Sequence, residues 1–279
     1  MSLIFKPEDH SYHSIDESDT TRWISVTTVT GHFKKAFDAK TQALKSSKNK
    51  KSKWYGMTPD QIEQAWLSEG TRSTVLGTYY HDQREADLLS LDTIERKGVI
   101  VPIIRPCITD DGVKLAPDQK LLNGIYPEHF VYLKSAGICG QSDLVEVVDG
   151  IVDITDYKTN KEIRTEGFKS WDGISQKLGF PVDHLDDCHL NLYALQLSFY
   201  MYIILRHNPS LKPGKMVLHH VIFEEDGRDQ FDNPINKLSF EGEPIVKEVK
   251  PIEIPYLKNE VMSIIKWMDL NRDLIKKNK

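Results

Sequence analysis

Cysteine is scarce in this chain of 279 residues. Only Cys107, Cys139 and Cys188 occur, and no two of them form a Cys-x-x-Cys pair. Three unevenly spaced cysteines provide neither a disulfide framework nor the ligand spacing of a zinc knuckle. A chain with so few thiols is typical of a reducing compartment. We therefore expect an intracellular, cytoplasmic protein.

Long apolar runs are also missing. The most apolar segment, Tyr193–Leu205, contains Gln196 and Ser198 and is shorter than the roughly 20 residues that a membrane-spanning helix needs. The first ten residues contain no apolar core of a signal peptide, and they include Glu8 and Asp9. We therefore expect no membrane segment, no secretory signal and no transit peptide.

The sequence has no excess of positive charge, since its formal net charge is −5. However, the segment from Lys34 to Lys53 contains eight lysines and a single acid, Asp38. Two interpretations stay open: a solvated helix and loop, or an arm that binds DNA. In the second case the phosphate-binding lysines and a base-stacking aromatic residue would be Lys48, Lys50, Lys51, Lys53 and Trp54.

The segment 140–159 has the most informative charge pattern. Two β-rich runs flank Asp149-Gly150, a dipeptide that favours a two-residue hairpin turn. With the turn at these positions, the numbers of facing residues sum to 299, so Asp143 lies opposite Asp156. Like charges that face each other are destabilising. Their repulsion would be about 3 kcal/mol at 5 Å and an effective dielectric near 20.

The rest of that sheet face is apolar, with Lys158 at its end: Val145, Val147, Val152 and Ile154. Two carboxylates and a lysine at one end of an apolar face suggest a divalent-cation site. A buried salt bridge is the structural alternative, but it would leave the second aspartate unpaired.

Apolar periodicity and capping residues predict the remaining elements. We expect helices over 29–44, 58–68, 71–89, 188–206 and 259–277. Gly70 is expected to separate the second helix from the third, in which His81 and Glu85 lie four residues apart on one face. Strands are expected over 128–133, 216–223 and 246–254, and segment 91–127 is expected to be mostly loop.

Four motifs follow one another along the chain: Gly77–His81 with Glu85, Gly140–Asp143, Asp156–Thr159 and Gln196–Tyr200. In this order they resemble the motifs of the RecB-like branch of the PD-(D/E)XK nuclease superfamily. Gly140-Gln141-Ser142-Asp143 resembles its Gly-x-x-Asp motif, and Asp156-Tyr157-Lys158-Thr159 resembles its Asp-Tyr-Lys-Thr motif. Gly77–His81 with Glu85, and Gln196–Tyr200, are similar to its histidine and Gln-x-x-x-Tyr motifs. Each motif is common by itself, so the resemblance depends on their shared order. The chain is similar in this respect to phage recombination nucleases and the mitochondrial genome-maintenance exonuclease.

The resemblance implies an α/β fold with a restriction-endonuclease-like core, in which helices flank a mixed central sheet. It implies a single nuclease domain over 1–279, with an N-terminal helical addition at about 29–90 and a catalytic core at about 77–255. The cofactor would be one or two Mg²⁺ or Mn²⁺ ions. Members of the branch with an iron–sulphur cluster use four cysteines, so we expect no cluster in a chain with three.

The resemblance also assigns metal ligands. They are an imidazole, three oxygen donors and a further carboxylate for a second metal: His81, Asp143, Asp156, the backbone carbonyl of Tyr157, and Glu85. Oxygen donors suit Mg²⁺, and an imidazole shifts the preference somewhat toward Mn²⁺.

Other residues would act on the substrate. Together with the two aspartates, Lys158 would contact the attacking water or the scissile phosphate, and Gln196 would orient the lysine or the phosphate. Tyr200 would contact the DNA strand. Glu128, just before the hairpin, is expected to have a supporting role.

We expect a metal-dependent DNA exonuclease that acts on single-stranded ends in replication, recombination or repair, in a bacterium or a phage-infected host. The preference for single strands rests on the resemblance alone. Two alternatives stay open: a structure-specific endonuclease that cuts flaps or junctions, and a non-catalytic DNA-binding subunit. Intact Asp143, Asp156 and Lys158 argue against the second, because a scaffold has no need for an electrostatically costly group of charges.

Overall fold

The computed structural model describes residues 3–6, 11–109, 112–116, 118–170 and 173–275. Within these ranges, the central sheet contains six strands: β3 (Ile24–Ser25), β8 (Gly124–Leu133), β9 (Ile138–Val148), β10 (Ile151–Lys158), β11 (Lys212–Phe223) and β14 (Val246–Ile254). Their order is β14-β11-β10-β9-β3, and β8 also pairs with β9. The sheet is mixed, because β10–β11 and β3–β9 are parallel pairs and the others are antiparallel.

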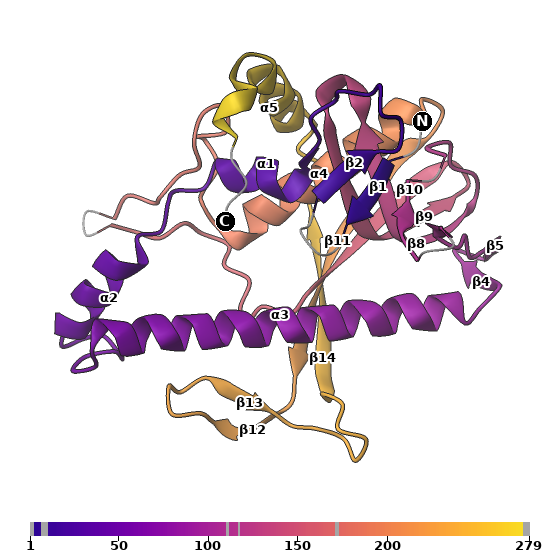
Figure 1. The fold of residues 1–279 in the computed structure, drawn as a ribbon. Helices are drawn as coiled ribbons and strands as arrows, with labels where there is room; N and C mark the ends of the chain where they lie inside the picture. The colour runs from indigo at the N-terminus through magenta and orange to yellow at the C-terminus, as the bar shows by residue number, and fades with distance from the viewer. Residues whose placement is uncertain (1–2, 7–10, 110–111, 117, 171–172, 276–279) are drawn as a thin grey trace.

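Helices cover both faces of this sheet (Figure 1). On one face, α4 (His189–His207) packs over the apolar side of the β9–β10 hairpin, together with α1 (Val26–His32) and α5 (Lys258–Asn271). On the other face, α3 (Pro59–Leu89) places Leu76 and Tyr80 against Tyr157 and Phe223. The expected α/β class, with a mixed sheet and flanking helices, is therefore confirmed.

The predicted hairpin forms with the predicted register. Ile151 pairs with Val148 and Thr155 with Leu144, so facing numbers sum to 299. The turn residues Asp149 and Gly150 both have positive φ, 52° and 75°, as a type I′ turn requires. The apolar residues of the inner face are all buried: Val145, Val147, Val152 and Ile154. Asp143 and Asp156 lie just beyond the last ladder pair, at the open end of the hairpin.

The expected helix break at Gly70 is wrong, because α3 is one continuous helix of 31 residues. It begins with the predicted capping box of Thr58 and Gln61, in which each side chain bonds to the other residue's backbone N–H. An exposed glycine costs a helix only about 1 kcal/mol relative to alanine. Burial of Leu76 and Tyr80 on the sheet outweighs that cost.

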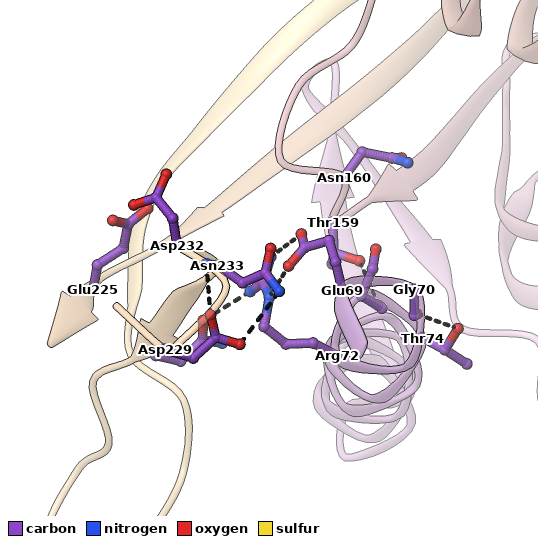
Figure 2. Close-up of polar contacts among 12 residues, drawn as sticks. Glu69, Gly70, Arg72, Thr74, Thr159, Asn160, Glu225, Asp229, Asp232 and Asn233 are labelled. Atoms are coloured by element: carbon purple, nitrogen blue, oxygen red, sulfur yellow. Dashed lines mark hydrogen bonds and ion pairs between the residues drawn. The ribbon is translucent and has the colours of Figure 1, made fainter. Parts of the chain in front are cut away.

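A hairpin docks on the side of α3 that faces away from the sheet body (Figure 1). It consists of β12 (Glu225–Arg228) and β13 (Pro234–Asn236). Figure 2 shows Arg72 of α3 turned toward it. Arg72 donates to both carboxylate oxygens of Glu69, at 2.8 and 2.6 Å, and to Asn236 at 2.9 Å. The contact with Asn236 holds this hairpin against α3.

Other boundaries differ from the prediction. The helix expected over 29–44 is two helices, α1 and α2 (Ala39–Lys48), because Asp38 caps the second one. Segment 91–127 contains the short strands β4 (Thr93–Arg96), β5 (Val99–Pro102), β6 (Cys107–Ile108) and β7 (Lys114–Leu115). β6 and β7 form a second sheet with β1 (Leu3–Lys6) and β2 (Ser11–Ser14), in the order β2-β1-β7-β6. β8 begins four residues earlier than expected, at Gly124.

Two single 3₁₀ turns complete the described elements: Lys134–Ala136 and Arg272–Leu274. The second follows α5, so the last helix ends before the predicted residue 277, which lies outside the described residues. No helix of the described part of the chain is both long enough and apolar enough to cross a membrane.

Replacing Gly70 by alanine should raise the free energy of unfolding by about 0.5–1 kcal/mol. The position is helical and exposed, and nothing lies within 4 Å of an added Cβ. Urea unfolding followed by circular dichroism measures the change. Gly56→Ala is the matched control, because space is also open there but φ is +84°. That variant should lose about 1 kcal/mol. Equal gains in both variants would contradict the helix-propensity argument.

Candidate metal centre and active site

Three side chains converge where α3 meets the open end of the β9–β10 hairpin. His81 comes from α3, Glu128 from β8 and Asp143 from β9, and their ligand atoms lie within 4.8 Å of one another. The Nδ1 atom of His81 is 3.4 Å from Asp143 Oδ1 and 3.6 Å from Glu128 Oε1. Two carboxylates and an imidazole directed at one point form a donor set for a divalent cation.

The backbone of Tyr157 orients two of these side chains. Its N–H donates to Asp143 Oδ2 at 2.7 Å, and its carbonyl oxygen lies 3.2 Å from His81 Nε2. With the proton on Nε2, His81 donates to this carbonyl, and the lone pair of Nδ1 faces the carboxylates. Histidines that bind metals are commonly held in this way. The carbonyl of Tyr157 therefore supports His81, and its predicted role as a metal ligand stays a prediction.

Glu128 reaches the cluster through an unusual backbone conformation. Its φ of 48° lies in the left-handed region, which residues other than glycine rarely adopt. Its neighbours Pro127 and His129 both pair with β9, whereas Glu128 interrupts the ladder. Its other carboxylate oxygen accepts a hydrogen bond from Gln141 Nε2 at 2.7 Å. Backbone strain of this kind is concentrated at functional sites.

The sequence predicts only a supporting role for Glu128, which the structure places directly in the cluster. The structure places its carboxylate as close to the His81 imidazole as that of Asp143, within a few tenths of an ångström. The signal that would have identified it is the register of β8 on β9, which sets Glu128 opposite Asp143. That register depends on a long-range strand pairing, so no local motif reports it.

Burial and mutual repulsion shift the protonation of this cluster. Burial and the carboxylate of Asp156 raise the pKa of Asp143 to about 7, although His81 and Lys158 act in the opposite direction. Burial lowers the pKa of His81, but the carboxylates of Glu128 and Asp143 outweigh it and raise this pKa to about 9. The metal-free protein thus holds a protonated imidazole among carboxylates at neutral pH. A cation must displace that proton, so its affinity should rise with pH.

Asp156, Lys158 and Gln196 form a second group on the α4 side of the same strand end. Lys158 Nζ lies 2.5 Å from Asp156 Oδ2, and Gln196 Nε2 lies 3.4 Å from Asp156 Oδ1. Burial lowers the pKa of Lys158, but the carboxylates of Asp156 and Asp143 outweigh this and raise it above its usual value. Lys158 is therefore a firmly protonated ammonium group. Asp156, a predicted metal ligand, lies beside the His81 cluster and faces this lysine.

The expected contact of Tyr200 with DNA needs correction. Its side chain is only 2% exposed, and it packs so closely on Gly140 that an added Cβ would lie 2.8 Å from the ring. Its hydroxyl accepts a hydrogen bond from Gln196 Nε2 at 3.2 Å. A side chain in the core cannot reach a bound strand, so Tyr200 instead supports Gln196.

Glu85 lies outside the cluster. Its two carboxylate oxygens accept hydrogen bonds from Lys114 Nζ of β7 at 2.9 and 3.2 Å. Both residues line a cleft of about 600 Å³ that also exposes His81 and Glu128. A role of Glu85 in binding a second metal stays a prediction, and it would require the ion pair with Lys114 to open.

The last two residues of the predicted DNA-binding arm, Lys53 and Trp54, contact other parts of the molecule. Lys53 lies 4.0 Å from Asp232 and 4.3 Å from the ring centroid of Trp54. Trp54 is half-buried and meets Trp66 of α3 edge-on, so stacking on a base would compete with this packing. The three preceding lysines are exposed: Lys48, Lys50 and Lys51. Their contact with DNA stays a prediction.

Comparisons with known proteins do not identify the chain. No protein-family model and no curated protein matches it. The crystal structure of SSO0001 is similar with a TM-score of 0.32 and 13% sequence identity, over 98% of this chain and 84% of that one. A TM-score this low carries no argument about fold or function. The family resemblance of the motifs therefore stays a hypothesis.

In metal-free protein, Asp143→Asn should raise the melting temperature at pH 8 but not near pH 4. The pKa of Asp143 is raised from 3.8 to about 7. The neutral carboxyl thus stabilises the fold fully below about pH 4, and this stabilisation is lost as pH rises through 7. Asparagine cannot ionise, so the variant avoids that loss. Thermal unfolding in EDTA across this pH range measures the difference.

Asp92→Asn, at a carboxyl that is 96% exposed, is the control and should show no such trend. Mn²⁺ should also raise the melting temperature of the wild-type protein at pH 8 and have little effect on Asp143→Asn. An equal rise in the melting temperature of Asp143→Asn at pH 8 and near pH 4 would contradict the raised pKa of Asp143.

Proposed function

We propose that this protein is a divalent-metal-dependent nuclease that hydrolyses phosphodiester bonds in DNA, with a PD-(D/E)XK-type site. The observation that carries the proposal is the partly buried cluster of His81, Glu128 and Asp143 beside the Asp156–Lys158 ion pair. A cation site next to a protonated lysine provides the two kinds of positive charge that an anionic diester requires. The motif resemblance supports the same assignment.

The residues of the site would have different roles. His81, Glu128 and Asp143 would hold the ion, which when bound supplies Lewis acidity toward the phosphodiester and lowers the pKa of water. Lys158 keeps its proton beside Asp156, so it would neutralise the charge that develops on the scissile phosphate. Gln196 bonds to Asp156 and Tyr200, and it thereby holds the carboxylate that positions the lysine.

Exonuclease action on single strands is the form that we favour. Site residues come from helices on both faces of the sheet, His81 from α3 and Gln196 from α4. A strand that reaches them between two such walls would enter most readily from an end. A structure-specific endonuclease and a non-catalytic DNA-binding subunit are the alternatives.

Linear single-stranded DNA should be degraded to short products with Mg²⁺ or Mn²⁺, whereas a covalently closed circle of the same sequence should survive. Gel analysis of matched linear and circular substrates, single- and double-stranded, measures this. EDTA should stop the reaction. Efficient cutting of the circle would favour the endonuclease, and binding without any cleavage would favour the non-catalytic subunit.

Lys158→Ala should lower the cleavage rate at least about 100-fold, because it removes a positive charge that acts in the transition state. Metal binding should persist, since Lys158 contacts the Asp156 side of the site. Lys215→Ala removes a lysine that is 69% exposed and paired with Glu253, and it serves as the control. Wild-type turnover in Lys158→Ala would refute the active-site assignment.

Glu128→Gln and Glu85→Gln form a matched pair that tests which glutamate serves the metal. Glu128→Gln should weaken Mn²⁺ binding by at least about 10- to 100-fold, the loss that follows even when a residue that only supports a metal ligand is removed. Glu85→Gln should have a much smaller effect, because Glu85 is bound to Lys114 outside the cluster. Isothermal titration with Mn²⁺ measures both. A larger loss in Glu85→Gln would reverse the assignment.

A further inference from the structure

A groove of about 580 Å³ lies between the end of α1 and the chain that follows β10. Among the described residues, its lining includes Lys34, Lys35 and Lys177 but no aspartate or glutamate. This is notable in a chain whose net charge is −5. Phe168 and Phe180, also in the lining, are 70% and 69% exposed. The groove therefore combines positive charge with two aromatic rings that the protein does not bury.

The two walls of the groove are held together from beneath. The buried carboxylate of Asp187 accepts hydrogen bonds from the backbone N–H of Lys35 at 2.9 Å and from Gln176 Nε2 at 2.7 Å. The N–H of Gly179 donates to the carbonyl of Phe33 at 2.8 Å. Lys177 is partly neutralised by Asp186 at 2.5 Å, so Lys34 and Lys35 provide most of the uncompensated charge. The groove is thus a shaped surface of the fold.

A row of side chains on α4 leads from this groove toward the candidate active site. The helix begins at His189, two residues after Asp187, and the Asp186–Asp187 pair supports the groove. His189, Tyr193 and Gln196 follow at helical spacing, so they share one face. The rings of His189 and Tyr193 stack at 6.1 Å, and Lys158 Nζ lies 4.8 Å from the Tyr193 ring. From His189 to Gln196 the helix rises about 10 Å.

We propose that this groove binds unpaired DNA next to the scissile bond, with bases stacked on Phe168 and Phe180 and phosphates held by Lys34 and Lys35. Exposed aromatic rings bind bases only where the bases are not paired, and lysines bind the backbone without regard to sequence. The inference rests on the proposed nuclease function. It assigns the single-strand preference to named residues, whereas the motifs by themselves do not.

The test measures binding of a fluorescent oligo(dT) of 20 nucleotides by anisotropy in Ca²⁺, without cleavage. Phe168→Ala/Phe180→Ala should weaken binding about 25-fold or more, since each of the two stacked bases contributes about a factor of five or more. Phe168→Ala/Phe180→Trp should bind more tightly than Phe168→Ala/Phe180→Ala, because a ring is again present at position 180. Lys34→Ala/Lys35→Ala should flatten the salt dependence. Phe240→Ala, at a fully exposed ring in the loop between β13 and β14, is the matched control and should change binding less than twofold.

A small substrate separates this inference from the proposed function. Bis(p-nitrophenyl) phosphate is too short to reach the groove, so the phenylalanine variants should hydrolyse it with Mn²⁺ at the wild-type rate. If the wild-type protein with Mn²⁺ hydrolyses neither bis(p-nitrophenyl) phosphate nor linear oligo(dT), the proposed nuclease function is rejected. Wild-type hydrolysis together with unchanged oligo(dT) affinity in the phenylalanine variants would reject the groove. An equal loss of affinity for blunt duplex DNA would overturn the assignment to unpaired strands.

Discussion

Two carboxylates buried at the end of one hairpin, Asp143 and Asp156, impose the constraint on which the rest of the structure depends. An uncompensated buried charge costs several kcal/mol, so each carboxylate needs a cation or a proton nearby. Asp156 obtains Lys158 from two residues along its own strand. Asp143 obtains His81 from a helix more than 60 residues earlier in the chain. The carboxylate of Asp143 therefore has its positively charged neighbour, His81, only after α3 has packed on the sheet.

The docking of α3 depends on contacts far from the site. Its middle is buried against the sheet through Leu76 and Tyr80, and one turn before them Arg72 connects it to Glu69 and to the β12–β13 hairpin. Thr159, directly after β10, donates its hydroxyl to the carbonyl of Ser73 at 3.2 Å. A shift of α3 by a fraction of a turn would move His81 away from both carboxylates. The accuracy of the site thus depends on the long helix as a rigid element.

The candidate site has two sides at the open end of the β9–β10 hairpin. The backbone of Tyr157 serves the His81 cluster, whereas the side chains of Asp156 and Lys158 face α4. The cleft lined by Glu85 and Lys114 opens on the side of the His81 cluster. The stacked rings of His189 and Tyr193 lie on the α4 side. The site is therefore bordered by charged side chains on one side and by aromatic rings on the other.

The sequence by itself determined the features that depend on neighbours along the chain. The Asp149-Gly150 turn fixes the hairpin register, and strict alternation then fixes which side chains are buried. α4 was also predictable to within about one residue, since its apolar stripe is long and regular. The pairing of Asp156 with Lys158 follows from the same alternation.

Only the tertiary structure decided the features that depend on distant segments. Gly70 stays helical because α3 is buried on the sheet, which a local propensity cannot report. Glu128 joins His81 through the pairing of β8 with β9, and Glu85 is diverted to Lys114 by a strand of the second sheet. Tyr200 becomes a core residue because Gly140 leaves room for its ring. Each of these features depends on a contact between segments that are distant in the sequence, so no local pattern reports it.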